Sequence, residues 1–245
     1  LGDVYKRQFS ESTLRIRASY KDIFRVPTFT DLYYLRMGNT NLKPEETSQY
    51  NVGVTWSSSC GDWLRHFSIS ADGYYNTVKD KIVALPTMYV WKMMNMGEVD
   101  IKGVDVNLST QFRLPLRMSL FLASTYSFQY AVDVTDPEAK NYKDQIPYTP
   151  RHSGTVSVTL ENPWVNVSYI LTAVGDRYAL PQNIDRNRID SYIEQSISIN
   201  RDFRFRYFGL RLQGELLNLT NVNYDVIQYY PMPGRSWRLS VCLSY

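Results

Sequence analysis

The chain has 245 residues and a formal net charge of +3, a near balance that argues against binding to nucleic acid. Its mean hydropathy is −0.35, and no apolar run approaches the ~18–20 residues that a membrane-spanning helix needs. Yet aromatic residues make up 14% of the chain, with 20 Tyr. A transmembrane β-barrel reconciles these values, because only alternate residues of each strand face lipid.

Residues 1–8 (LGDVYKRQ) lack the apolar core and cleavage site of a secretory signal peptide. They also do not continue the pattern that follows them. We therefore interpret residues 1–8 as a non-native leader, and we expect residues 9–245 to come from a longer protein with a truncated N-terminus.

Strands with one apolar face follow one another along the rest of the chain. In each strand, apolar or aromatic residues alternate with polar or small ones, which is the period of two of a β-strand. We predict about ten strands of ~9–15 residues, which are long for a soluble sandwich and suit a bilayer. The alternating segments are Leu14–Tyr20, Tyr50–Trp56, Phe67–Tyr75, Val104–Leu108, Met118–Phe128, Val156–Leu160, Val165–Leu171, Ile193–Ile199, Phe208–Leu216 and Trp237–Tyr245.

The last segment indicates which face meets lipid. Turning Arg238 toward lipid would cost ~2–4 kcal/mol near the membrane midplane, so the opposite face is the lipid face. Trp237 and Tyr245 are separated by about 26 Å along a strand, which places one aromatic residue at each interface. The apolar residues of this strand are Trp237, Leu239, Val241, Leu243 and Tyr245.

The connections alternate between short and long. Outer-membrane barrels keep short turns in the periplasm and long loops outside, so the C-terminus is expected in the periplasm. We expect open sheet edges at Leu14–Tyr20 and Arg235–Tyr245. The predicted short turns are near Ser57–Asp62, Arg113–Arg117, Glu161–Pro163 and Arg201–Phe203, and the predicted long loops are Lys21–Thr47, Lys79–Met96, Ala131–Arg151, Val174–Ile189 and Thr220–Gly234.

The most specific segment is Phe24–Trp56 (FRVPTFTDLYYLRMGNTNLKPEETSQYNVGVTW). Its proline ends a strand by removing a hydrogen-bond donor, and its glycine and asparagines supply turn conformations. The segment resembles the barrel of TonB-dependent receptors, where a strand ends in F-R-x-P-T-F-x-(D/E)-L-Y and a loop carries G-N-x-N-L-K-P-E. The motif residues are Phe24, Arg25, Pro27, Gly38, Asn39, Asn41, Leu42 and Pro44.

Four further segments resemble the same family in the family's order: Asp100–Leu108, Ile146–His152, Leu216–Tyr224 and Pro231–Arg235. The resemblance implies an all-β, antiparallel, up-and-down transmembrane barrel of 22 strands, of which this chain supplies about ten, with a plug domain upstream. It also implies that the last strand, from Trp237 to Tyr245, is the signal for the barrel assembly machinery, although the family more often ends in Phe.

The resemblance further implies a function without cofactors or enzymatic chemistry. Such receptors sit in the Gram-negative outer membrane and import a scarce, bulky ligand, of siderophore-iron, haem or cobalamin type, with energy supplied through the TonB complex. The implied partners are the TonB complex, the barrel assembly machinery, the lipid bilayer, the small-molecule ligand and a surface lipoprotein. The segment Tyr75–Ile82, followed by Trp91 and Asp100–Val104, resembles cobalamin-type receptors of gut Bacteroidetes.

The best ligand candidates are apolar residues in the predicted loops. Tyr89, Trp91, Met93 and Met94 form a soft apolar cluster that suits a bulky, partly apolar ligand. Tyr229 and Tyr230 are weaker candidates because interfacial aromatic residues lie near them. The simpler interpretation is that all six residues only pack against neighbouring loops.

An enzyme is not indicated. The two histidines, His66 and His152, are far apart and each has a structural use at a strand end, and no metal site or phosphate-binding loop is visible. Glu45 and Glu46 are predicted to be solvated loop charges. Two other classes stay open: a passive porin would share the strand alternation, and a soluble β-rich binding module would bury it.

Overall fold

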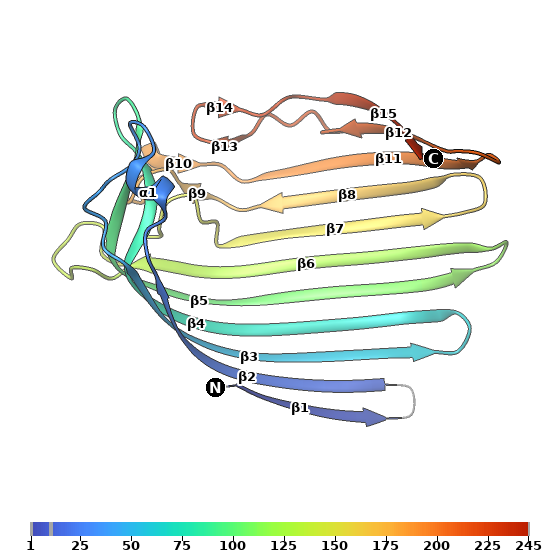
Figure 1. The fold of residues 1–245 in the computed structure, drawn as a ribbon, viewed down its shortest axis with the longest axis horizontal. Coiled ribbons are helices and arrows are strands. Elements are labelled where there is room, and N and C mark those ends of the chain that lie inside the picture. The colour runs from blue at the N-terminus through green and yellow to red at the C-terminus, as the bar shows by residue number, and fades with distance from the viewer. Residues whose placement is uncertain (1, 10–11, 245) are drawn as a thin grey trace.

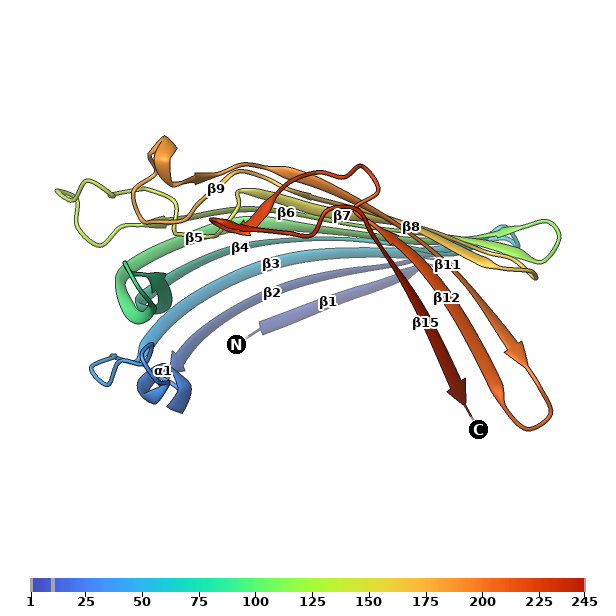
Figure 2. The same cartoon turned by 90° about the horizontal axis from the view of Figure 1, so that it is seen from above.

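The computed structural model describes residues 2–9 and 12–244, and the side chains of residues 12–85 and 87–244. It contains one antiparallel sheet of eleven strands that follow one another in chain order (Figure 1). The sheet is strongly curved (Figure 2). The strands are β1 (Gly2–Phe9), β2 (Ser12–Arg25), β3 (Glu45–Cys60), β4 (Leu64–Pro86), β5 (Trp91–Leu114), β6 (Met118–Asp133), β7 (His152–Glu161), β8 (Asn166–Val174), β11 (Tyr192–Arg204), β12 (Gly209–Leu217) and β15 (Ser236–Ser244).

The register confirms the predicted alternation by gathering the apolar residues on one face. This apolar face carries Val52 and Trp237, which are 59% and 80% exposed. Successive residues of a strand point to opposite faces, so Asn51 and Arg238 share the other, polar face. One row of register partners on the apolar face, across β7, β8, β11, β12 and β15, is Val158, Tyr169, Ile197, Leu216 and Trp237.

Two rows of aromatic residues bound the apolar face. Tyr20, Tyr50 and Tyr75 are register partners, with ring centroids 4.8 Å apart in the first pair and 6.5 Å apart in the second. Nearer the short turns, the rings of Trp56 and Phe67 lie 5.3 Å apart. Tyr50 and Trp56 are separated by about 20 Å along β3. Aromatic rows near both ends of the apolar face are typical of the girdles of an outer-membrane barrel.

The prediction of a long loop at Lys79–Met96 is wrong, because the hydrogen-bonded ladder between β4 and β5 continues through this segment. β4 ends at Pro86 and β5 begins at Trp91, which leaves only the turn Thr87–Val90. The backbone N–H of Thr87 donates to the carbonyl of Val90 at 2.8 Å. The cause is the apolar, β-branched composition around Ile82-Val83, which favours a strand beyond the membrane band as well as within it.

The turn predicted at Arg201–Phe203 is also displaced. Arg201 and Phe203 pair with Leu212 and Leu210 inside the β11–β12 ladder. The turn lies at Phe205–Phe208, where the Phe205 N–H donates to the Phe208 carbonyl at 2.9 Å and the two rings stack. The alternation of apolar and charged residues in β11 continues past Arg201 to Arg204, so the strand is longer than predicted.

The sheet has its edges at β1 and β15. The predicted edge at Leu14–Tyr20 is wrong, since Gly2–Phe9 pairs antiparallel with Ser12–Ser19. The predicted edge at the last strand is confirmed up to Ser244, and Tyr245 lies outside the described residues. That residues 1–8 are non-native stays a prediction.

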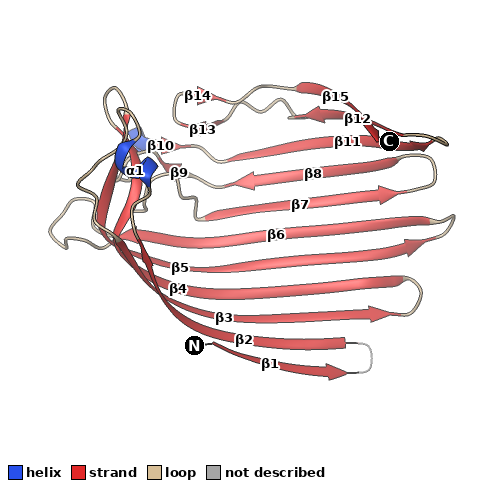
Figure 3. Cartoon of the chain, viewed as in Figure 1, coloured by secondary structure: helices blue, strands red, loops and turns tan. Residues whose placement is uncertain are grey.

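Short helices and strands lie at the end of the sheet that carries the long loops (Figure 3). The helix α1 was not predicted, although Thr28 and Asp31 form a capping box at its start. No helix in the described part of the chain is long and apolar enough to cross a membrane. The short elements are α1 (Phe29–Tyr33), β9 (Arg177–Tyr178), the 3₁₀ turn η1 (Asp185–Asn187), β10 (Arg188–Ile189), β13 (Asp225–Ile227) and β14 (Tyr230–Pro231).

The buried core lies at this loop end and not in the middle of the sheet. Val99 and Ala131 are fully buried, and Ile146 from the loop after β6 packs on them. Their burial is possible because residues 134–151 fold back over the ends of β4, β5 and β6. The loop end is therefore an ordered, packed layer that can position a binding site.

Candidate functional site

A cavity of about 540 Å³ lies at the loop end of the sheet. It is bounded by the β4–β5 hairpin, the loop after β6, the start of β11 and the β13 strand. Val174 and Tyr192 are register partners and lie two residues from Thr172 and Glu194, which are on the polar face. The cavity therefore lies over that face. Most of its wall is apolar. The aliphatic lining includes Val83, Leu85, Ile146, Val226 and Ile227.

Three aromatic residues complete the wall. The rings of Trp91 and Tyr148 are 5.7 Å apart and tilted by 40°, and Tyr192 stacks on Tyr224 at 4.1 Å behind the wall. The backbone N–H of Tyr148 donates to the carbonyl of Tyr178 at 2.7 Å, which fixes the loop that carries this ring. Burial raises the pKa of Tyr148 above its usual range. The nearby Arg177 charge and a backbone group of Gln228 oppose this rise in the pKa.

The structure brings one of the six predicted ligand residues into this cavity. Trp91 lines it, whereas Tyr89 is 90% exposed at the hairpin tip. Met93 is fixed through its backbone, which accepts from Asn39 and donates to Met37, and Met94 is 44% exposed. Tyr229 and Tyr230 are 79% and 68% exposed on the β13–β14 hairpin.

The sequence reading missed Tyr148, Arg177 and Tyr192. Tyr148 lies inside the predicted family segment Ile146–His152, but nothing marked it as facing a cavity. Arg177 follows the end of β8 closely, in a segment that was predicted only as a loop. Their convergence depends on how three loops fold over the sheet, which leaves no local pattern.

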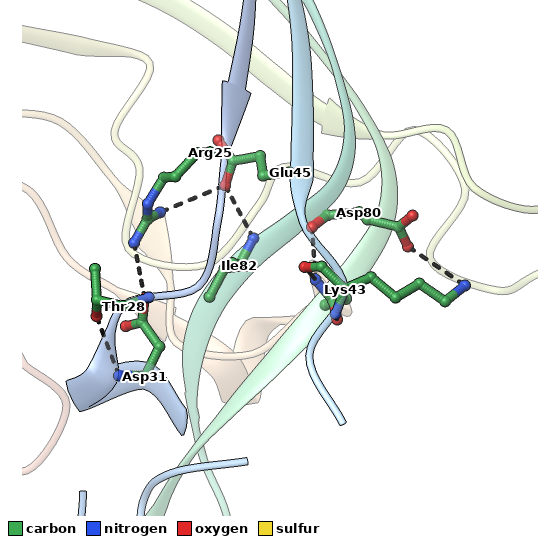
Figure 4. Close-up of polar contacts among 8 residues, drawn as sticks. Arg25, Thr28, Asp31, Lys43, Glu45, Asp80 and Ile82 are labelled. Atoms are coloured by element: carbon green, nitrogen blue, oxygen red, sulfur yellow. Dashed lines mark hydrogen bonds and ion pairs between the residues drawn. The ribbon is translucent and has the colours of Figure 1, made fainter. Parts of the chain in front are cut away.

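The residues of the loop motif fasten the first long loop to the β4–β5 hairpin (Figure 4). The Arg25 guanidinium donates to Asp31 Oδ2 at 3.1 Å and to Glu45 Oε2 at 3.5 Å. The same Glu45 oxygen accepts from the backbone N–H of Ile82 at 3.1 Å. The prediction that Glu45 is a solvated charge is therefore wrong, because its side chain is only 16% exposed and bridges two segments.

A second set of bonds joins the same segments further along the loop. The Asn39 amide donates to the Met93 carbonyl at 3.1 Å. Asn95 accepts from the Lys43 N–H at 2.9 Å and donates to the carbonyls of Lys43 and Asp80 at 3.1 and 2.7 Å. These contacts hold the hairpin that carries Trp91.

The other motif residues have local roles in the same loop. Asn41 donates its backbone N–H to Asn39 Oδ1 at 3.0 Å, as in an Asx turn, and Leu42 is buried. A Cβ on Gly38 would lie 2.5 Å from the Leu32 carbonyl oxygen, so only glycine fits there. Phe24 is 61% exposed at the end of β2, and Pro27 and Pro44 flank the loop.

The two histidines lie apart, in β4 and β7. His66 Nε2 is 3.3 Å from the Ser109 hydroxyl, and His152 Nδ1 is 2.9 Å from the Tyr126 hydroxyl. Both contacts tie one strand to its neighbour.

The apolar residues of the last strand are aligned on the apolar face. Trp237, Leu239, Val241 and Leu243 are all at least 60% exposed, on a strand with one unpaired side. The fifth residue of the predicted assembly signal, Tyr245, lies outside the described residues.

Known proteins resemble this chain along nearly its whole length. The vitamin B12 transporter BtuB of Photobacterium profundum is 25% identical over 236 residues, which cover 92% of this chain and 34% of that protein. The structure of the copper transporter OprC matches with a TM-score of 0.70 at 16% identity, covering 99% of this chain and 38% of OprC. The ferric citrate transporter FecA matches with a TM-score of 0.69 at 12% identity, covering 99% of this chain and 37% of FecA.

The chain thus spans about a third of the length of these relatives. The structural matches support the fold alone, at these low identities. The family model described as TonB dependent receptor-like, beta-barrel matches residues 1–219, which is most of the sequence. The chain belongs to the β-barrel family of TonB-dependent receptors.

Proposed function

We propose that this chain is part of an outer-membrane receptor that imports a scarce, bulky nutrient with energy supplied through TonB. The observation that carries the proposal is the cavity of about 540 Å³ over the polar face at the loop end. Concave, mostly apolar sites with a few convergent polar groups are typical of small-molecule binding. In a closed barrel the polar face lines the lumen, so a ligand bound there lies on the route inward from the cell surface.

The ligand classes that we propose are siderophore-bound iron, haem and cobalamin. The vitamin B12 transporter is similar to 92% of this chain, which makes cobalamin the first ligand to test. A gut Bacteroidetes source stays a prediction from the sequence.

The proposed partners follow from the same assignment. The TonB complex would engage an N-terminal plug region upstream of this chain, and the barrel assembly machinery would recognise the last strand. A surface lipoprotein would contact the long loops, and the C-terminus would lie in the periplasm. The strands of this sheet would complete a 22-stranded barrel with strands from the upstream part of the protein.

Uptake by cells that make the full-length receptor tests the proposal. The host is a Gram-negative strain without receptors of its own for labelled cobalamin, a ferric siderophore and haem, compared with the same strain lacking TonB. We expect saturable uptake of one ligand that disappears without TonB. Equal uptake in both strains would instead identify a passive channel, and a protein that folds as a soluble monomer in plain buffer would identify a soluble binding module.

A further inference from the structure

Arg177 is a buried cation at the wall of the cavity. The residue lies in the short strand β9 and is only 3% exposed. Nη2 donates to the backbone carbonyls of Asp225 and Val226, the latter at 3.2 Å, and the guanidinium lies 5.5 Å from the centre of the Tyr192 ring. These contacts orient the guanidinium without neutralising its charge.

No carboxylate of the described residues pairs directly with that charge. None of the ion pairs within 4.0 Å in this part of the chain includes Arg177. Its Nη1 atom is buried and has no hydrogen-bond partner in the described part of the chain. An arginine stays protonated in proteins, and a buried charge without a partner is costly. Arg177 therefore brings a positive charge to the wall of this cavity that no carboxylate of the described residues pairs with, and such a charge favours an anion as the ligand.

The composition of the cavity narrows the kind of anion. Among the described residues that line the cavity, Arg177 is the one with a charge, and the rest have aliphatic, aromatic or proline side chains. In such a poorly polar environment, the attraction between a guanidinium and an anion is stronger than in water. Carboxylate and phosphate groups match the planar fork of a guanidinium. The aromatic walls formed by Trp91 and Tyr148 suit a flat, apolar body attached to that group.

We propose that Arg177 receives the carboxylate or phosphate group of a ligand whose apolar or aromatic body fills the cavity. A volume of about 540 Å³ holds a compact molecule, or one anionic arm of a larger one. The physiological meaning of this site rests on the proposed uptake function. The charge preference itself is a property of the cavity and is measurable without transport.

Binding of matched probes to the purified full-length receptor tests the proposal. The probes are 2-naphthoate, 2-naphthyl phosphate and the neutral 2-naphthamide, which share one aromatic body and are compared by calorimetry in the same detergent. We expect at least one anion to bind about tenfold or more tightly than the amide, because a hydrogen bond to a charged group is favourable when both partners are buried. The tighter of the two anions identifies whether the site prefers carboxylate or phosphate.

Two variants separate Arg177 from general surface charge. Arg177→Met should abolish the preference for the anion and leave the affinity for 2-naphthamide nearly unchanged. Arg188→Met is the matched control, because Arg188 lies in the adjacent β10 but is exposed and paired with Asp176 at 2.9 Å. It should keep the full preference.

Three outcomes would overturn the proposal: equal affinity for all three probes in the wild-type receptor, no binding of either anion, or a preference that survives Arg177→Met. The comparison of probes in the wild-type receptor needs no variant, so it stands even where Arg177→Met fails to fold. Uptake that does not depend on TonB, together with an intact anion preference, would contradict the proposed function and leave this site in place. TonB-dependent uptake without an anion preference would contradict this site and leave the proposed function in place.

Discussion

The guanidinium of Arg17 in β2 and the carboxylate of Asp72 in β4 form an ion pair with an N–O distance of 2.6 Å, although a whole strand separates them. The pair passes over Gly53 of β3, which is the register partner of both residues. A Cβ on Gly53 would lie 1.9 Å from Asp72 Oδ1 and 3.1 Å from Arg17 Nη2. The glycine therefore leaves the space through which the two charges meet on the polar face.

This relationship predicts coupling between Gly53 and Asp72. Gly53→Ala in an Asp72→Ala background should stabilise the strand by ~0.5–1 kcal/mol, because alanine loses less backbone entropy than glycine on folding. In the wild-type background the same change displaces the carboxylate and should be neutral or destabilising. The free energy of unfolding in urea, measured for the four proteins in detergent, gives the coupling. Effects that add within ~0.3–0.5 kcal/mol would contradict it.

Glu45 should control the attachment of the first long loop to the hairpin. Glu45→Ala leaves the backbone N–H of Ile82 without its acceptor, at a cost of about 1–3 kcal/mol. We expect the Ile82 amide to exchange its hydrogen about 10- to 100-fold faster. The control is Glu46→Ala, since Glu46 is exposed and one residue away. Similar exchange at Ile82 in the two variants would show that the bridge does not hold the hairpin.

The cap of α1 should open in acid. The pKa of Asp31 lies below its usual range, chiefly because the Thr28 backbone N–H donates to it at 2.9 Å, and also because Arg25 is close. A lowered folded-state pKa gives stability that is present above the usual Asp value of about 3.9 and is lost as pH falls through the folded value.

Hydrogen exchange at the Thr28 amide, corrected for intrinsic pH dependence, measures this effect. We expect constant protection from pH 7 down to about 4 and a loss of protection below that range. Asp31→Asn should remove the step. If the Thr28 amide of Asp31→Asn lost protection to the same extent, the loss would have to be assigned to another titrating group.

Trp91 should matter more for ligand affinity than the other aromatic residues of the hairpin. Trp91→Ala removes a wall of the cavity and should weaken binding of the transported ligand by about 2 kcal/mol, roughly 30-fold, as buried aromatic anchors do. Tyr89→Ala, at the exposed tip, should have a much smaller effect. Titration of the full-length receptor checks both, and unchanged affinity in Trp91→Ala would remove the cavity as the ligand site.

Much of the fold could be predicted because a period of two is a local signal. The alternation in segments such as Tyr50–Trp56 and Trp237–Leu243 identified the strands, and the register places their apolar residues on a shared face. Alternation does not say where a strand leaves the membrane. For this reason a loop was predicted at Lys79–Met96, where the ladder continues, and a turn was predicted before its actual position at Phe205–Phe208.

The site was predictable only in part. The loop motif identified Asn39 and Arg25, which do fasten the loop, but their partners Met93, Asp31 and Glu45 become apparent only when the loop and the hairpin are placed side by side. Arg177 is the clearest case. Its burial and missing counter-charge arise from the packing of separate loops, which one sequence does not reveal.

Spin labels at positions 239 and 240 of the full-length receptor, reconstituted in lipid, test the membrane assignment most directly. Leu239 lies on the apolar face of β15 and Ser240 on its polar face. We predict that a label at 239 collides freely with dissolved oxygen and is shielded from a water-soluble nickel chelate, and that a label at 240 behaves in the opposite way. Two labels that report the same surroundings, either both dry or both aqueous, would contradict the assignment of one face to lipid and the other to the barrel interior.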